Sequence, residues 1–242
     1  MKRHSNRRDV HELGSTLVEL MVAIGILVLV TGGILSQLGN ATQRIGAEQV
    51  KVDNLDEARD FVDQFFRDIN QIGYPNGRIV GFAPTISDPR VAVGLVQISA
   101  TSLWFEGDIN GSGVVQSVQY MVNGSGNCTL CLQRSQIAKV AGNPLTGQSA
   151  ADWGTEVNDI TTTTIFTYFD ANGNAVAALP ADINSNGAVL ASVKTIHISL
   201  TIQNNAVKDP KTGQPIQTSF EGEVSLNNCS MAASGVPPMS CQ

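Results

Sequence analysis

One apolar run near the N-terminus limits what this 242-residue chain can fold into more than any other feature. From Thr16 to Leu38 the run contains a single charged residue, Glu19. Because a helix rises about 1.5 Å per residue, a run of this length matches the hydrocarbon core of a bilayer, about 30 Å thick. The sequence therefore predicts a transmembrane helix over residues 15–38.

The carboxylate of Glu19 is an unusual group for such a segment. An acidic side chain costs roughly 2.5 to 3.5 kcal/mol at the centre of a membrane helix and less near its ends. An ionisable residue there is a functional hypothesis by default. The alternative interpretation is local, because Thr16 and Glu19 have the spacing of a capping box that begins a helix.

Residues 1–14 form a basic leader in front of the apolar run. The leader has a net charge of +2, and the remainder of the chain has −8. By the positive-inside rule, this arrangement predicts a cytoplasmic N-terminus and an exported C-terminal part. An acidic exported part has no general attraction to nucleic acid. An ordinary signal peptide over residues 1–35 is the alternative, although its apolar region usually spans only about 7–15 residues.

The segment that joins the leader to the apolar run resembles the cleavage and methylation motif of type IV prepilins and type II secretion pseudopilins. The residues that carry the resemblance are Gly14, Ser15, Thr16, Leu17, Val18 and Glu19. The resemblance implies that a prepilin peptidase cuts the Gly14–Ser15 bond, that Ser15 becomes N-methylated, and that Glu19 guides assembly. The family usually has Phe where this chain has Ser15.

Residues 39–75 read as an amphipathic continuation of the same helix. An apolar stripe recurs at three- and four-residue steps, with Phe61 and Phe66 beside it. The stripe consists of Leu55, Ala58, Val62, Phe65, Ile69 and Ile72. Gly73 and Pro75 then predict the end of the helix. The sequence thus predicts one helix from Ser15 to Ile72, with a weak point near Gly39–Gly46.

The rest of the chain, residues 76–242, reads as one exported domain of strands and turns. Strict alternation of apolar and polar residues predicts half-buried antiparallel strands at Lys194–Gln203 and Thr218–Leu226, joined by a long polar loop over Asn204–Pro215. The other expected strands are Val91–Ser99, Ser102–Glu106, Val114–Val122, Leu130–Ser135 and Ile165–Asp170. The stretch Phe166–Asn174, followed by a long alternating strand and the loop Asp209–Gln214, resembles PilW-type minor pilins and also J-type minor pseudopilins.

Together these features predict an α+β fold of the pilin-like lollipop kind, with the long helix packed on an antiparallel β-sheet domain. The resemblance implies a minor pilin of a type IV pilus, with a minor pseudopilin of a type II secretion system as the alternative. It implies as partners the prepilin peptidase, other pilin or pseudopilin subunits and an inner-membrane assembly platform. The expected location is the bacterial inner membrane in a single pass, and then a filament on the periplasmic or cell-surface side.

Three turns rich in Asp, Asn and Gly are candidates for calcium or for simple chain reversal. They are Asp108–Gly113, Asp170–Asn174 and Asp182–Gly187. The third matches the first half of a calcium loop, but Val193 stands where the loop needs its bidentate glutamate. Turns of this composition ordinarily close hairpins, so we expect structural turns and no metal.

The four cysteines, Cys128, Cys131, Cys229 and Cys241, all lie in the part expected to be exported, where disulfides persist. Three pairings are open, and we favour Cys128–Cys131 with Cys229–Cys241. The second would resemble the C-terminal disulfide loops of pilins. A redox motif and a zinc site are the alternatives.

No catalytic constellation or cofactor motif is apparent in the sequence. After the leader, the sole histidine is His197, on the polar face of an expected strand. The sequence therefore predicts a structural subunit rather than an enzyme. A membrane-anchored extracytoplasmic binding module is a further alternative, which would need neither Gly14 nor Glu19.

Overall fold

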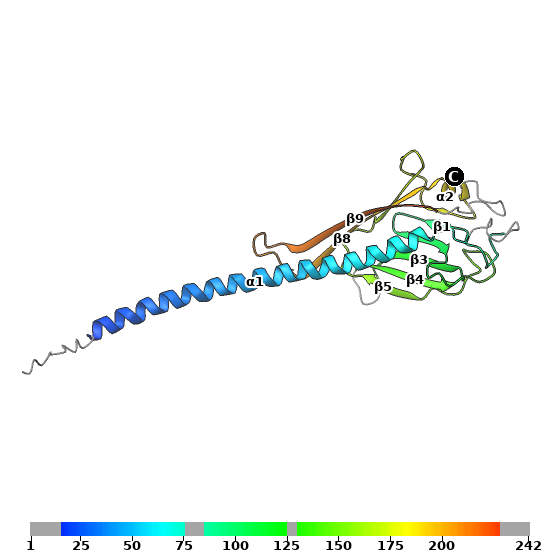
Figure 1. The fold of residues 1–242 in the computed structure, drawn as a ribbon. Coiled ribbons are helices and arrows are strands. Elements are labelled where there is room, and N and C mark those ends of the chain that lie inside the picture. Colours follow the sequence, from blue (N-terminus) through cyan, green and yellow to red (C-terminus); the bar gives the residue numbers. More distant parts are fainter. Residues whose placement is uncertain (1–15, 76–84, 125–129, 228–242) are drawn as a thin grey trace, which may run out of the picture. The chain divides into compact units, whose positions relative to one another are not determined.

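The computed structural model describes residues 16–75, 85–124 and 130–227 (Figure 1). The chain divides into two compact units, Met1–Gly46 and Ala47–Gln242. The elements are α1 (Leu17–Asn70), β1 (Leu95–Ile98), β2 (Ser102–Gly107), β3 (Gln116–Asn123), β4 (Cys131–Ala138), β5 (Trp153–Val157), β6 (Phe166–Phe169), β7 (Ala181–Asp182), α2 (Gly187–Ser192), β8 (Thr195–Lys208) and β9 (Pro215–Ser225).

Helix α1 is one uninterrupted helix of 54 residues, as the sequence predicted. It begins at Leu17 and ends at Asn70, slightly inside the predicted limits, and it continues through the expected weak point at Gly39–Gly46. Past its end, Gly73 adopts a φ of 78° and its N–H donates to the carbonyl of Glu106 at 2.9 Å. This turn directs the chain away from the helix axis beside β2.

The C-terminal half of α1 buries the apolar stripe that the sequence predicted, with one correction. Ala58, Phe61 and Phe65 are buried, but Leu55 is 48% exposed. The buried face of the helix instead includes Asn54 and Asp68. Leu55 is rotated by about 100° from Asn54 around the helix axis, which moves it off the buried face.

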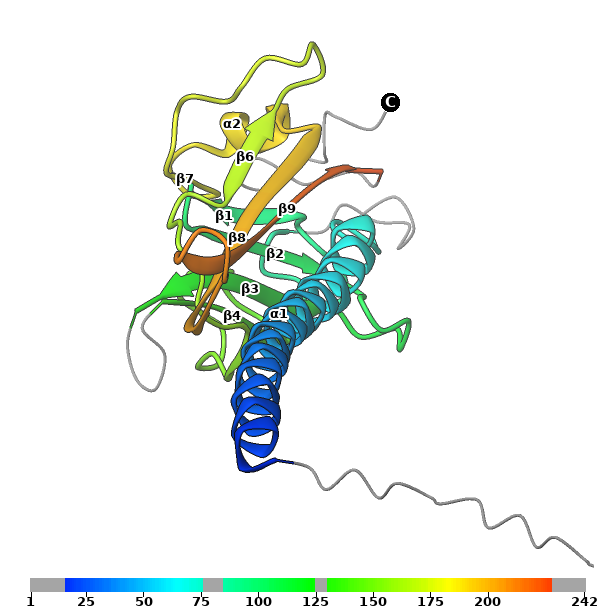
Figure 2. The same cartoon turned by 90° about the vertical axis from the view of Figure 1, so that its left-hand side faces the viewer.

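Two antiparallel sheets make up the strand part of the second unit (Figure 2). The larger has six strands in the order β5-β4-β3-β2-β1-β7, and the smaller has the order β6-β8-β9. With α1, they establish the α+β class, and every strand pair is antiparallel as expected.

The two longest strands confirm the predicted alternation and extend it. Ile196, Ile198, Leu200 and Ile202 are buried along β8. The predicted loop Asn204–Pro215 is wrong at both ends, because β8 continues to Lys208 and β9 begins at Pro215. Polar cross-strand pairs sustain the ladder there, since the Gln217 side chain donates to Gln203 Oε1 at 2.6 Å.

Elsewhere the strand predictions hold with shifted limits. Strand β1 is shorter than Val91–Ser99, and β5, β7 and α2 were not predicted.

Aromatic side chains join helix and sheets into one core. Phe65 of α1 lies 5.4 Å from Tyr120 of β3 and 6.0 Å from Phe166 of β6, measured between ring centroids. The second half of α1 is therefore in contact with both sheets.

Candidate functional site

The N-terminal part of α1 exposes an apolar surface on all sides. From Leu17 to Leu38 every large apolar side chain is between 52% and 77% exposed. A helix that is apolar all round is normally covered, either by protein or by lipid. By its length and composition, this segment is long and apolar enough to cross a membrane.

Glu19 lies in the first turn of α1 and forms a complete capping box. Its Oε2 accepts from the N–H of Thr16 at 2.8 Å, and the Thr16 hydroxyl accepts from the N–H of Glu19 at 3.3 Å. The structure thus contains the local contact that the capping interpretation predicts. The assembly role of Glu19 stays a prediction. Gly14 and Ser15, the predicted cleavage and methylation residues, lie outside the described residues.

Four glycines follow one another along the same helix at seven-residue intervals. They are Gly25, Gly32, Gly39 and Gly46. A Cβ placed on any of them would meet nothing within 4 Å. Small residues on one side of a helix allow a second helix to approach closely in a membrane. The interval is visible in the sequence, where only Gly39–Gly46 was interpreted, as a weak point of the helix.

A buried polar cluster fixes α1 on the six-stranded sheet. Asp68 Oδ2 accepts from the Tyr120 hydroxyl at 2.7 Å and from Arg134 Nη2 at 2.8 Å, and Gln64 donates to Asp68 Oδ1 at 2.7 Å. Burial, with the adjacent Asp68 charge, raises the pKa of Tyr120 well above its ordinary value. Tyr120 is therefore a hydrogen-bond donor at neutral pH, and the cluster sets the rotation of α1.

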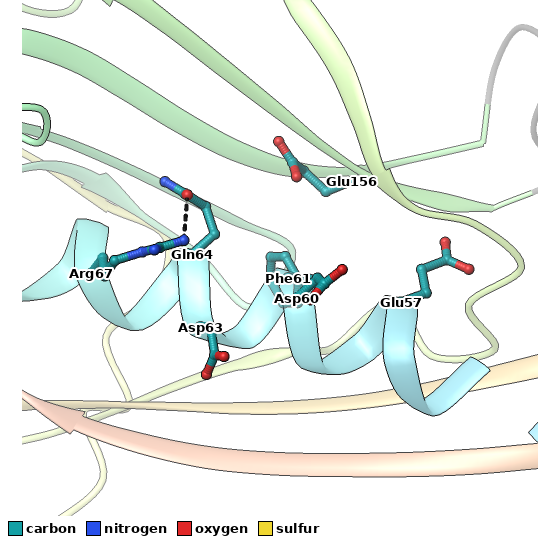
Figure 3. Close-up of a pocket in the computed structure, with 7 residues that line it drawn as sticks. All are labelled: Glu57, Asp60, Phe61, Asp63, Gln64, Arg67 and Glu156. Atoms are coloured by element: carbon teal, nitrogen blue, oxygen red, sulfur yellow. Dashed lines mark hydrogen bonds between the residues drawn. The ribbon is translucent and has the colours of Figure 1, made fainter. Parts of the chain in front are cut away.

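An acidic groove runs between α1 and β5 (Figure 3). It has a volume of about 580 Å³ and is lined by Glu57, Asp60, Phe61, Asp63, Gln64, Arg67 and Glu156. Glu156 lies across the groove from the helix, on β5. Burial raises the pKa of Glu156, and the neighbouring Arg134 charge opposes that shift. The groove places four carboxylates together, and its lining residues include no Ser, Cys, His or Lys.

The Asp-rich turns are closed by their own backbone. The Asp108 carboxylate accepts from the N–H groups of Ser112 and Gly113, at 3.0 and 2.8 Å. Asp170 and Asp182 each accept from backbone N–H groups two to four residues on. Among the residues that the structure describes, no group of three or more His, Cys, Asp or Glu side chains is arranged to hold a metal ion.

Among the four cysteines, Cys131 lies within the described ranges; it is buried at the start of β4 and is disulfide-bonded. Cys128, Cys229 and Cys241 lie outside those ranges, so the favoured pairing stays a prediction. His197 is partly exposed on β8, opposite Thr167 and Glu223.

No family model, curated protein or solved structure matches this chain.

Proposed function

We propose that this chain is a minor pilin subunit of a type IV pilus, made as a precursor and assembled into the filament or used to prime it. The observation that carries the proposal is the first half of α1. It presents an unpartnered apolar surface on all sides, with one carboxylate in its first turn. A simple membrane anchor would need that carboxylate only as a helix cap.

Processing comes first in this proposal. The leader stays in the cytoplasm, the prepilin peptidase cuts between Gly14 and Ser15, and the new N-terminal Ser15 is methylated. The glycine supports close approach of the peptidase to the backbone, because it has no side chain. The cut creates a positive amine one helical turn before Glu19. The cut chain remains a single-pass protein of the inner membrane until assembly.

Assembly then removes both charged groups from water. An unpaired charge in an apolar filament core costs far more free energy than a paired one. A pair between Glu19 of one subunit and the amine of the next would offset that cost and fix the axial register. The capping contact is compatible with this role, since it uses only Oε2 of Glu19. The glycines at seven-residue intervals would let neighbouring helices pack closely.

Three variants separate the assembly role of Glu19 from capping. Glu19→Gln keeps much of the cap and removes the charge, whereas Thr16→Ala removes the hydroxyl half of the cap and keeps the charge. Glu48→Gln is the matched control, because Glu48 is an exposed carboxylate on the same helix outside the apolar segment. We expect all three to be cut and inserted, and only Glu19→Gln to be lost from sheared filaments. Equal loss of Thr16→Ala and Glu19→Gln would instead assign Glu19 to capping.

Intact mass of the membrane-extracted protein tests the processing step separately. A chain that begins at a methylated Ser15 supports the proposal. A chain that begins at Met1 contradicts it and favours a membrane-anchored binding module. Recovery of the cut chain with secretion pseudopilins, but not with pili, would assign it to a type II secretion system.

A further inference from the structure

Strand β9 is the edge strand of the three-stranded sheet, in which β8 lies between β6 and β9 (Figure 2). On the side away from β9, the odd-numbered residues of β8 make the backbone hydrogen bonds. The N–H groups of Ser199 and Gln203 donate to carbonyls there at 3.0 and 2.9 Å, and the Thr201 carbonyl accepts at 2.9 Å. Because successive residues of an antiparallel strand direct their backbone groups to alternate sides, the even-numbered residues of β8 bond to β9.

The strand register carries this alternation into β9. Ile198 pairs with Gly222 and Leu200 pairs with Phe220, so the even-numbered residues of the two strands are bonded to each other. The odd-numbered residues of β9 therefore direct their N–H and C=O groups away from β8. They are Gln217, Ser219, Glu221, Glu223 and Ser225. Within the described ranges, no strand pairs with this outer edge of β9.

Helix α1 covers one face of β9 rather than its edge. A Cβ placed on Gly222 would lie 2.6 Å from the ring of Phe66, so the even-numbered side chains of β9 point toward the helix. Ile216 and Val224, which lie on that same face, are buried. The five odd-numbered side chains are all exposed on the opposite face. The outer edge thus runs between a face that packs on the helix and a face that is open to solvent.

The outer edge of β9 lacks several of the features that normally protect an edge strand. Native edges are kept from pairing by Lys, by Pro, by bulges, by short length or by a covering segment. From Gln217 to Ser225 there is no Lys, Arg or Pro. The register with β8 is continuous over this stretch, and β9 is 11 residues long, compared with about 5–6 for an ordinary strand. A long, regular edge of this kind is a template for an additional strand.

The charges beside this edge indicate what kind of strand it accepts. Glu221 and Glu223 stand opposite Ser199 and His197 of β8, and within the described ranges neither carboxylate forms an ion pair. A strand added at the edge would place its own side chains directly beside these two carboxylates. Opposite charges in that position are favourable and like charges are unfavourable. The chain after the leader is itself strongly acidic, so charge complementarity favours a basic partner over a second copy.

We infer that the outer edge of β9 binds an extended basic segment of another protein as an added antiparallel strand, with Lys or Arg at alternate positions beside Glu221 and Glu223. The antiparallel orientation matches every strand pair of both sheets. In this orientation the basic residues lie opposite the odd-numbered residues of β9, so their N–H groups make the backbone bonds. The edge contains neither Glu19 nor any part of α1, so it is separate from the proposed assembly role.

Backbone N-methylation of a peptide probe separates strand addition from simple charge attraction. The probe is a fluorescently labelled nonapeptide of alternating Lys and Val, and its anisotropy is measured with the full chain in non-ionic detergent. Methylation of the Lys N–H groups blocks the bonds to β9, whereas methylation of the Val N–H groups blocks only the far side, and both keep every charge. We expect the Val-methylated peptide to bind as the unmodified one does, and the Lys-methylated peptide to bind about tenfold more weakly or worse. No binding of the unmodified peptide at millimolar concentration, or an equal or reversed effect of the two methylations, would overturn the inference.

Two variants place the binding on β9. Glu221→Gln combined with Glu223→Gln should weaken it several-fold, and Asp53→Asn with Asp56→Asn is the matched control, because it removes two exposed carboxylates from α1. Ser219→Pro removes an outward N–H and keeps the bonds to β8, so this variant should fold and bind about tenfold more weakly. Parental affinity in both β9 variants would refute the site. Sedimentation of the chain alone gives a further check, since a dimer that Ser219→Pro abolishes would assign the edge to a second copy and overturn the inference.

Discussion

Lys139 and Glu106 form an ion pair that is completely buried. Lys139 Nζ lies 2.6 Å from Glu106 Oε2, and neither side chain is exposed. The ammonium also donates to the carbonyls of Val91 at 3.0 Å and Ile86 at 3.2 Å, which occupies all three of its donors. The pair therefore ties the segment before β1 to the sheet.

Removal of one partner of this pair should destabilise the fold strongly. Lys139→Met leaves Glu106 buried without a counter-charge, and we expect a loss of about 3–5 kcal/mol in the free energy of unfolding. Urea denaturation of the full chain in detergent measures it. The double variant Lys139→Met with Glu106→Gln should recover part of the loss. Parental stability of the single variant would show that the pair is not a structural requirement.

The hydroxyl of Tyr120 should contribute measurably to the contact between α1 and the sheet. Tyr120→Phe removes the hydrogen bond to Asp68 and keeps the ring, so we expect a loss of about 1 kcal/mol. Asp68→Asn should cost more, because it also leaves Arg134 without its counter-charge. A double-mutant cycle on the two positions gives their coupling. If the two losses in the free energy of unfolding were strictly additive, Tyr120 and Asp68 would not act in one cluster.

Glu156 should make stability depend on pH in the acidic range. Burial raises its pKa in the folded protein above the ordinary value of about 4.3. The folded state therefore holds this proton more tightly, so the favourable contribution is complete below pH 4 and is lost as the pH rises through the folded pKa. We expect Glu156→Gln to be more stable than the parent at pH 7 and equal to it below pH 4. If the parent protein were more stable than Glu156→Gln at pH 7, the predicted direction of the pH dependence would be wrong.

Metal removal should leave the Asp-rich turns intact. The Asp108 carboxylate already accepts two backbone N–H groups, and the Asp170 and Asp182 turns are closed in the same way. The melting temperature should therefore be the same in calcium and in excess chelator. Asp108→Ala, in contrast, should lower it. A melting temperature that falls on chelation would identify a bound cation.

The features that were best predicted from the sequence are those that depend on residues close together along the chain. The helix from Leu17 to Asn70 and the alternation along β8 are periodic patterns, and the capping box joins residues three positions apart. Strand β5 was not predicted, because its five residues include Gly154 and lack a clear alternation. The position of a short edge strand depends on the strand with which it pairs. Periodicity in the sequence does not show that pairing.

Contacts between distant residues were beyond the reach of the sequence patterns. A charged residue such as Asp68 is ordinarily expected on the solvated side of a helix. It is buried, however, and accepts a hydrogen bond from Arg134, which lies 66 positions later. Trp104 and Trp153 are aligned across the sheet only through the register of three strand pairs. In both cases the pairing of strands decides which side chains meet, and that pairing is a property of the whole core.

The contact between α1 and the last strand has a consequence for the order in which the molecule is made. A side chain at Gly222 of β9 would collide with Phe66 of α1, and Val224 belongs to the core that covers Phe65. Synthesis proceeds from the N-terminus. The helix face that needs cover is thus produced first, and one of the strands that cover it is produced last. A chain stalled before β9 would leave the phenylalanines of the helix uncovered. A truncation near the end of the chain would therefore damage the packing of a helix that lies far from it in sequence.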